Sequence, residues 1–392
     1  MHRNIARTSL VPAEVISALP LDQNTLNHVD SGRSAVKQLL EYPRSNGRLL
    51  VIIGPCSIHH LDAALDYATR LAAAAARHQD QLLIAMRVYI EKPRTTVGWK
   101  GLVHDPDLTQ ADNSDIARGI LVSRGIMLSV VKMGLPIATE ILSPLLMPFI
   151  HDLLTVGVIG ARTTESQTHR ELSSDVTFPV GFKNNTEGSL KSAIDAMTAA
   201  AQPHTMLGID EHGCLVHRLS SGNLDTFAVL RGGSSGPNYS RKHVGQAEMA
   251  LVKSGMQSRI VIDCSHGNSS KDYRNQGRVA AAVAEQIAAG SGILGVMIES
   301  NINPGRQDIP PCGSSGLAYG VSITDGCVGW DETEAILDML SAAVKQRQTD
   351  QKVTNSVPAL ASEPSSRNMT LVQKNDIVIT TKALSGSLGS IS

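Results

Sequence analysis

The chain has 392 residues, of which 42% are hydrophobic and 18% charged, so it can bury a large core as one barrel or as two smaller domains. Its formal net charge of −1 excludes a global basic field for nucleic acid or an anionic membrane surface, and no apolar run is long enough to span a membrane. The five cysteines are widely spaced and form no C-x-x-C pair, which argues against a disulfide framework and favours a reducing, cytoplasmic location.

From residue 46 onward, the chain carries short apolar runs that end in Gly, Pro or a polar side chain. Such runs predict strands. Residues 1–45 precede them and are predicted to form an N-terminal arm with one helix around Ser34–Glu41. The eight predicted strands are Leu49–Pro55, Leu82–Tyr89, Pro136–Glu140, Val156–Arg162, Pro179–Lys183, Thr226–Arg231, Arg259–Ser265 and Leu294–Glu299.

Ala-rich or amphipathic stretches between these runs predict helices. Alternating strands and helices imply a parallel sheet, and eight units favour a closed (β/α)8 TIM barrel over residues 46–347. The loop 301–319 is expected to cover the active site. Residues 348–392 are rich in Ser and Thr and predict a poorly ordered tail, within which Asp376–Thr380 could form a strand. The predicted helices are Leu61–Arg77, Ser189–Ala201, Val244–Ser254, Arg278–Ala289 and Glu332–Val344.

Cations recur where the predicted strands end. Arg87 closes the second strand and is followed by Lys92-Pro93-Arg94-Thr95. Arg162, Lys183 and Arg231 end the fourth, fifth and sixth strands in the same way. One such ending is usually a solvated surface charge. Four in series predict a shared site for a small, multiply anionic substrate, because the carboxyl ends of barrel strands meet at one face.

Side chains that can bind a metal also follow predicted strands. Cys56, His266, Glu299 and Asp325 lie at strand ends or in the loops after them. The first, seventh and eighth strands are neighbours in a closed barrel, so these side chains can converge. Alone, Cys56 could be a small core residue and Glu299 a surface acid. Together, a thiolate, an imidazole and two carboxylates suit one divalent ion, either Mn, Fe, Co or Zn.

These residues stand in motifs that resemble one enzyme family. Gly54-Pro55-Cys56-Ser57-Ile58-His59, Glu91–Gly101, Ile159–Gln167, Asp263–Lys271 and Ser322–Asp325 are similar to segments of type I 3-deoxy-D-arabino-heptulosonate 7-phosphate (DAHP) synthases. The resemblance is collinear from about residue 30 to 345. It implies condensation of phosphoenolpyruvate with erythrose 4-phosphate, the first step of the shikimate pathway.

The resemblance also implies roles for individual residues. Cys56, His266, Glu299 and Asp325 would bind the metal. Arg94 and Thr95 would hold the aldose phosphate. Lys92 would relay a proton to the new alkoxide, with Glu140 as a partner. The phosphate and carboxylate of phosphoenolpyruvate would be held by Arg87, Lys92, Ala161, Arg162, Lys183 and Arg231.

Partners follow from the same resemblance. Relatives of this kind imply an aromatic amino acid as a feedback inhibitor and a homodimer or homotetramer. The arm and the stretch Ser143–Thr155 match only loosely, so the identity of the inhibitor stays open. His104 stands where the family commonly has Asn, and Asp115 where an aromatic residue is usual.

Three other functions compete with this interpretation. A 3-deoxy-octulosonate 8-phosphate synthase shares the barrel and the cysteine position but typically has Lys-Ala-Asn-Arg-Ser in place of Lys92–Thr96. A non-catalytic regulatory barrel would have lost a ligand or a cation, and none is lost. A class II metal aldolase needs fewer strand-end cations, because it binds only one phosphate.

Overall fold

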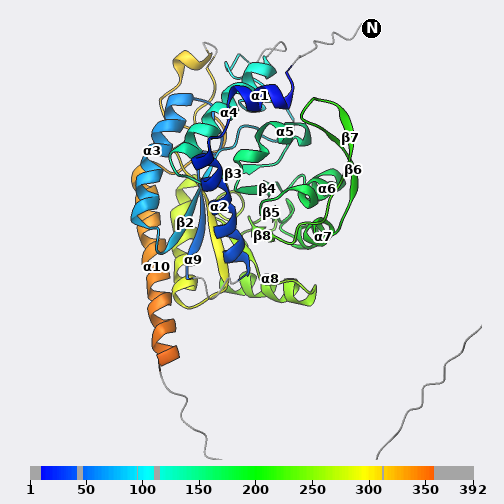
Figure 1. Ribbon diagram of the computed structural model, residues 1–392. Coiled ribbons are helices and arrows are strands. Elements are labelled where there is room, and N and C mark those ends of the chain that lie inside the picture. Colours follow the sequence, from blue (N-terminus) through cyan, green and yellow to red (C-terminus); the bar gives the residue numbers. More distant parts are fainter. Residues whose placement is uncertain (1–9, 42–46, 95, 110–114, 311–312, 357–392) are drawn as a thin grey trace, which may run out of the picture.

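Eight parallel strands form a closed barrel in the computed structural model, which describes residues 10–41, 47–94, 96–109, 115–310 and 313–356 (Figure 1). The order around the barrel is β1-β10-β9-β8-β5-β4-β3-β2. All eight predicted strands are confirmed, as β1 (Leu49–Gly54), β2 (Leu82–Arg87), β3 (Ile137–Glu140), β4 (Val156–Ile159), β5 (Val180–Lys183), β8 (Thr226–Leu230), β9 (Ile260–Asp263) and β10 (Ile293–Glu299).

Helices lie between successive strands and cover the outside of the barrel. The predicted helix Leu61–Arg77 is found with those bounds, and the other predicted helices differ at their ends by a few residues or extend further. The elements are α3 (Leu61–Arg77), α4 (Ile116–Lys132), η1 (Pro144–Leu146), α5 (Met147–Ile150), η2 (His151–Leu153), α6 (Gln167–Asp175), α7 (Lys191–Ala200), α8 (Arg241–Lys253), η3 (Tyr273–Asn275), α9 (Gln276–Ala288), η4 (Gly313–Gly316) and α10 (Trp330–Ser356).

The barrel interior is a separate apolar cluster, enclosed by the strands. Alternate residues of each strand face inward. Leu50 and Ile52 of β1 and Leu83 and Ala85 of β2 belong to this cluster, together with Ala138 of β3 and residues of β4, β8, β9 and β10. Continuing the same alternation by two residues places a polar or charged side chain above the apolar layer at the carboxyl end of most strands.

The N-terminal arm contains two helices, α1 (Pro12–Ala18) and α2 (Gln23–Glu41), where one helix around Ser34–Glu41 was expected. Val36, Leu39 and Leu40 of α2 join the apolar cluster of the barrel interior. The Arg259 guanidinium, just before β9, donates to the Leu40 carbonyl at 2.9 Å. The end of α2 therefore closes the barrel at the amino ends of its strands, opposite the site.

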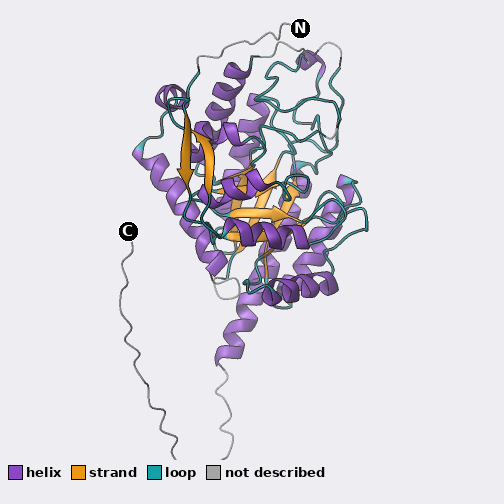
Figure 2. Cartoon of the chain, turned by 90° about the vertical axis from the view of Figure 1, so that its right-hand side faces the viewer, coloured by secondary structure: helices purple, strands orange, loops and turns teal. Residues whose placement is uncertain are grey.

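A hairpin that was not predicted lies outside the barrel, formed by β6 (Thr205–Ile209) and β7 (Leu215–Leu219) (Figure 2). Its pairing is antiparallel, with Thr205 opposite Leu219 and Ile209 opposite Leu215. Asp210 closes the turn by accepting hydrogen bonds from the N–H groups of His212 and Cys214, at 2.9 and 2.8 Å. Most of its residues are exposed, unlike the buried runs that revealed the barrel strands.

Helix α10 begins at Trp330 and continues to Ser356, well beyond the predicted end at Val344. The strand considered for Asp376–Thr380 lies outside the described residues. Among the residues described, no helix combines the length and apolarity needed to cross a membrane.

Candidate active site at the carboxyl ends of the barrel strands

Charged and polar side chains from five strands form a layer directly above the apolar interior. They occupy the inward positions that follow the apolar residues of each strand. The layer comprises Cys56 after β1, Arg87 of β2, Lys183 of β5, Asp263 of β9 and Glu299 of β10, and all five are buried. Because all strands of the closed barrel are parallel, residues far apart in sequence meet at one end of the barrel.

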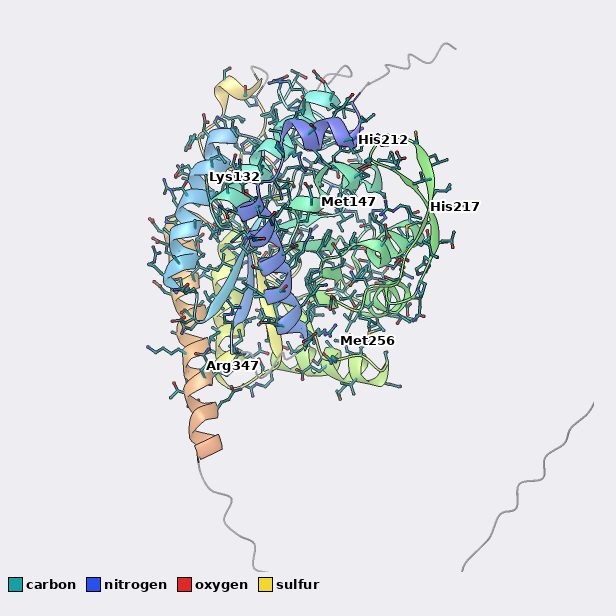
Figure 3. All side chains as sticks on the ribbon, in the orientation of Figure 1. Lys132, Met147, His212, His217, Met256 and Arg347 are labelled. Atoms are coloured by element: carbon teal, nitrogen blue, oxygen red, sulfur yellow. The ribbon has the colours of Figure 1, made fainter. Side chains whose placement is uncertain are left out.

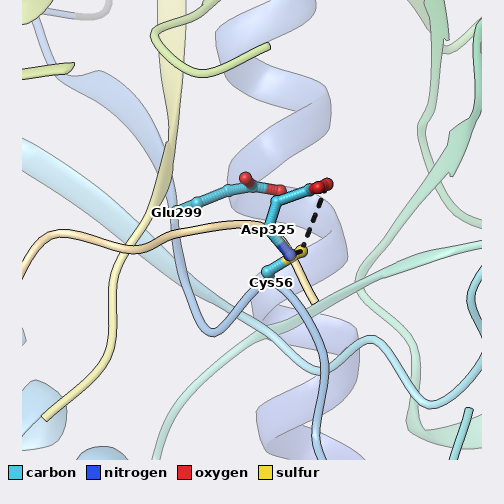
Figure 4. A group of neighbouring side chains, drawn as sticks. All are labelled: Cys56, Glu299 and Asp325. Carbon is cyan, nitrogen blue, oxygen red and sulfur yellow. Dashed lines mark hydrogen bonds between the residues drawn. The ribbon is translucent and has the colours of Figure 1, made fainter. Parts of the chain in front are cut away.

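Cys56, Glu299 and Asp325 form a compact cluster of possible metal ligands (Figure 4). One ligand atom from each lies within 4.8 Å of the other two. Cys56 Sγ lies 3.6 Å from Asp325 Oδ2. Cys56 and Glu299 are buried and Asp325 is exposed. A soft sulfur with two carboxylates fits a borderline divalent ion better than Ca or Mg, which prefer oxygen ligands alone.

Backbone geometry at Gly54 sets the position of Cys56. Gly54 has a φ of +151°, and a Cβ on it would lie 3.0 Å from the carbonyl oxygen of Arg87. Only glycine tolerates both the dihedral angle and this close approach of the neighbouring strand. The chain therefore turns inward directly after β1 and brings the Cys56 sulfur over the barrel.

His266, the fourth predicted ligand, lies beside this cluster but is not part of the mutually close set. Its Nε2 is 4.0 Å from Glu299 Oε1. Its Nδ1 lies 3.0 Å from Asp263 Oδ2 and 2.7 Å from Ser265 Oγ. A carboxylate that holds the far nitrogen of an imidazole is a common device for orienting a metal-binding histidine. His266 has a φ of +55°, a conformation found often at functional sites.

Each buried cation of the layer, and the buried Lys92 beside it, contacts an acidic group or a sulfur. Arg87 Nη2 donates to Glu299 Oε1 at 3.1 Å, and Lys183 Nζ donates to Asp263 Oδ2 at 2.8 Å. Lys92 Nζ lies 3.1 Å from both the sulfur and the carbonyl oxygen of Cys56. Arg87 Nη1 is buried without a hydrogen-bond partner among the described residues. A buried donor of this kind is uncommon and marks a place for a further acceptor.

The protonation of these groups follows from burial and their neighbours. Burial, reinforced by Glu299, raises the pKa of the Cys56 thiol to about 12. Burial disfavours a charged Lys92, but Cys56, Glu299 and Asp325 outweigh it and raise the pKa of its ammonium. Without a bound cation, Cys56 is therefore a neutral thiol beside a charged Lys92.

Asp263 carries the opposite shift. Burial disfavours its charge, but Lys183 and His266 outweigh burial and hold the pKa of this carboxyl well below its usual range. The sequence analysis missed Asp263, although it lies within the predicted strand Arg259–Ser265, three residues before His266. Its position as an inward-facing acid at a strand end was the available signal.

The remaining predicted substrate-binding residues lie nearer the rim. Burial lowers the pKa of the Arg231 guanidinium, and the charge of Arg162 contributes in the same direction. Arg162 and Arg94 are exposed, and Ala161 is partly buried. Arg94 Nε donates to the Trp99 carbonyl at 2.9 Å. Thr95 lies outside the described residues.

Glu140, the proposed partner of Lys92, ends β3 and is partly buried. Its carboxylate lies against Gly160, where a Cβ would collide with Glu140 Oε1. Glu140 is close enough to Lys92 to contribute to the raised pKa of that ammonium. The position is compatible with an electrostatic role toward Lys92.

The two residues that depart from the family pattern have structural partners. Asp115 precedes α4 and accepts a hydrogen bond from the Arg118 N–H at 3.0 Å, so it caps the helix. His104 Nε2 lies 3.2 Å from Glu91 Oε1, and Glu91 Oε2 accepts from the Ser143 N–H at 3.1 Å. Neither residue takes the place of a member of the buried charged layer.

Comparisons with known proteins agree on one family. The model of the DAHP synthetase I family matches residues 44–338. The chain is 48% identical over 356 residues to the tyrosine-inhibited phospho-2-dehydro-3-deoxyheptonate aldolase of Schizosaccharomyces pombe, covering 90% of this chain and 94% of that protein. It is 47% identical to the Phe-sensitive aldolase of Escherichia coli K12, covering 86% and 95%.

A solved structure is similar over nearly its whole length. The phospho-2-dehydro-3-deoxyheptonate aldolase of Francisella tularensis superposes with a TM-score of 0.84 at 40% sequence identity, covering 88% of this chain and 99% of that one.

The ion pair between Lys183 and Asp263 should make stability depend on pH. Asp263→Asn leaves the Lys183 ammonium buried without its counter-charge, so we expect a loss of about 3 kcal/mol in the free energy of unfolding at pH 7. Because the pKa of Asp263 is lowered in the folded protein, this stabilisation is present above the unfolded pKa of about 3.9 and is lost as the pH falls further.

Urea unfolding of wild type and Asp263→Asn at pH 7 and at pH 3 measures this difference. The difference in the free energy of unfolding between the two proteins should be smaller at pH 3 than at pH 7. Equal stability of both proteins at pH 7 would contradict a stabilising role for the pair.

Proposed function

The chain belongs to the DAHP synthetase I family, and on that premise we propose that it condenses phosphoenolpyruvate with D-erythrose 4-phosphate and water. The products are 3-deoxy-D-arabino-heptulosonate 7-phosphate and phosphate. This reaction begins the shikimate pathway and thereby aromatic amino acid biosynthesis. The observation that carries the proposal is the meeting of a cluster of possible metal ligands and several buried cations at one end of one barrel.

We propose that the cations hold the two anionic substrates. Phosphoenolpyruvate would lie against Arg87, Lys92 and Lys183, with Arg162, Arg231 and the backbone of Ala161 nearer the rim. Arg94 and Thr95 would bind the aldose phosphate. Two anions repel each other, and fixed cations offset that repulsion without having to reorganise during the reaction. The buried Arg87 Nη1, which has no partner among the described residues, supports this placement.

We also propose that Cys56, His266, Glu299 and Asp325 bind one divalent ion, either Mn, Fe, Co or Zn. The donor set supports this, since three of the four ligand atoms are already mutually close. When bound, such an ion would act as a Lewis acid toward the aldehyde oxygen of the aldose. The neighbouring Lys92 ammonium, 3.1 Å from the Cys56 sulfur, would favour the thiolate form.

In the reaction, C3 of phosphoenolpyruvate attacks the aldehyde carbon. Water adds at C2, and phosphate leaves by cleavage of its bond to that carbon. The chain's own part is to align the two substrates and to move a proton. We propose that Lys92 Nζ gives its proton to the new alkoxide, with Glu140 as an electrostatic partner.

Phosphate release tests the function directly. Purified protein supplied with Mn²⁺ should release phosphate from phosphoenolpyruvate when erythrose 4-phosphate is present, and much less with arabinose 5-phosphate. Exhaustive chelation should abolish the release, and Mn²⁺ or Co²⁺ should restore it. Preference for the pentose phosphate would favour a 3-deoxy-octulosonate 8-phosphate synthase. Absence of turnover with either aldose would favour a non-catalytic barrel.

Lys92→Arg separates proton transfer from charge neutralisation. Arginine keeps the positive charge, but its pKa is too high for it to donate a proton at neutral pH. If Lys92 relays a proton, kcat should fall by about 100-fold or more while the affinity for phosphoenolpyruvate, measured by calorimetry, stays near that of wild type. A variant with near-normal kcat would exclude the relay and leave Lys92 as a binding residue.

We propose that an aromatic amino acid inhibits the enzyme from a second site. The names of the fission yeast and E. coli relatives specify tyrosine inhibition and Phe sensitivity. A cavity of about 560 Å³ lies between α5, α6 and the β6–β7 hairpin, away from the charged layer. Met147, Leu172, Phe178 and Met206 contribute apolar surface, and His151 and Arg218 contribute polar groups. Met147 and His212 both line this cavity and are labelled in Figure 3.

Filling this cavity should remove inhibition but not activity. At least one of phenylalanine, tyrosine and tryptophan should lower phosphate release by wild type. Met206→Trp, on the cavity wall, should reduce that inhibition by about 10-fold or more because it occupies the space of the ligand. Met249→Trp, at an exposed methionine of α8 that does not line the cavity, is the matched control and should stay inhibited. Inhibition that survives Met206→Trp would move the regulatory site elsewhere.

Assembly into a homodimer or homotetramer is the remaining part of the proposal on partners. Leu207, Leu215 and Leu219 of the hairpin are each more than two-thirds exposed, and exposed apolar side chains grouped in this way are typical of surfaces that subunits cover on assembly. Light scattering of the purified protein tests the assembly, and a monomeric mass would refute it.

We propose a cytoplasmic location. Four described cysteines, Cys56, Cys214, Cys264 and Cys327, are free thiols, which suits a reducing compartment. Cell fractionation tests the location, and recovery in an oxidising compartment would refute it.

A further inference from the structure

Glu299 is the last residue of β10, and the two strands beside it end at different heights. On one side β1 extends to Gly54, which pairs with Glu299. On the other side β9 ends at Asp263, which pairs with Met297. The sheet therefore stops two residues short of Glu299 on the β9 side. A backbone group left there without a partner would be costly, because Glu299 is buried.

Backbone hydrogen bonds show toward which neighbouring strand each residue at the end of β10 points. The Met297 carbonyl accepts from the Cys264 N–H at 2.8 Å, so Met297 faces the β9 side. The Ser300 N–H donates to the Gly54 carbonyl at 2.9 Å, so Ser300 faces β1. Residues two apart on a strand face the same side, and Glu299 therefore points its N–H toward the space beyond the end of β9.

The side chain of Gln276 occupies that space. Its Oε1 accepts from the Glu299 N–H at 2.9 Å, and its Nε2 donates to the Glu299 carbonyl at 2.9 Å. One side-chain amide thus takes the place of the two backbone groups, a carbonyl and an N–H, that a longer β9 would offer to Glu299. The Glu299 carbonyl also accepts from the Val328 N–H at 3.0 Å, whereas the Glu299 N–H has no acceptor other than Gln276 Oε1 among the described residues.

Gln276 is itself held in place. It is the first residue of α9 and is completely buried. Asn275, just before it, donates from Nδ2 to the Ser269 carbonyl at 3.0 Å, which ties the start of the helix to the segment that follows His266. The amide therefore comes from a rigid element rather than from a free loop.

We infer that Gln276 is a positioning residue for the metal centre, an inference that rests on the proposed function. It acts through the backbone of Glu299, from which the carboxylate reaches toward Cys56 and Asp325. Without the amide, the Glu299 N–H would lose its acceptor, and the Val328 N–H would be left to hold the Glu299 carbonyl on the β9 side. The Glu299 carboxylate would then be held less firmly in the position that metal binding requires, and the affinity for the ion would fall.

Gln276→Met tests this, since methionine has a similar length and shape but cannot make either hydrogen bond. Gln286→Met is the matched control, because Gln286 is a buried glutamine of the same helix whose amide donates to the carbonyls of Tyr239 and Ala282, away from the site. Calorimetric titration of the metal-free proteins with Mn²⁺ gives the affinity without requiring turnover. Thermal unfolding of the same metal-free proteins reports any general loss of stability.

We expect Gln276→Met to bind Mn²⁺ about 10- to 100-fold more weakly than wild type. The Mn²⁺ affinity of Gln286→Met should stay within about twofold of that of wild type, because Gln286 makes its hydrogen bonds away from the site. Equal Mn²⁺ affinity of Gln276→Met and wild type would overturn the inference and leave the metal centre intact. Failure of wild type itself to bind Mn²⁺ would instead overturn the metal centre, and the inference with it.

If Gln276→Met does not fold, Gln276→Asn and Gln286→Asn replace the pair. Asparagine keeps the buried amide but is one methylene shorter, so it cannot reach both groups of Glu299. The same weakening is expected for Gln276→Asn, and affinity equal to that of wild type would again overturn the inference.

Discussion

Pairing of buried opposite charges is the constraint on which the site depends. Arg87, Lys183 and Lys92 are all buried at one end of the barrel, and transfer of a single unpaired ion into a protein interior costs several kcal/mol. Arg87 contacts Glu299 and Lys183 contacts Asp263, while Lys92 lies beside Cys56 and is supported by the carboxylates. The strands must therefore end in this register, because a shift by one residue would turn an inward charge into the helix layer.

The same pairing links the two halves of the proposed site. Glu299 is both the partner of Arg87 and one of the possible metal ligands, and Asp263 is both the partner of Lys183 and the group beside His266 Nδ1. A divalent cation among the ligands would draw Glu299 away from Arg87, and an anionic substrate beside Arg87 would offset the charge that is left.

Sequence reasoning found the parts of this arrangement that depend on strand alternation. The eight strands and the side chains at their ends could be recognised in the sequence, because buried parallel strands are continuous apolar segments. The β6–β7 hairpin was missed because its strands are largely exposed and lie outside the barrel. The extent of α2 was also missed, since the Val36, Leu39 and Leu40 face that enters the barrel is short compared with the whole helix.

Gln276 illustrates what a sequence cannot reveal. A glutamine at the start of a helix usually indicates an exposed first turn, and this one is completely buried. Its role follows from the unequal ends of β9 and β1 beside β10, which depends on strand register and on where each strand leaves the sheet. Register is a property of the packed barrel.

Asp115 shows the converse, because its departure from the family pattern is explained by local chemistry alone, as a cap of α4. Local rules thus account for the caps and strand ends, whereas the support beneath a ligand is set only when distant elements pack together.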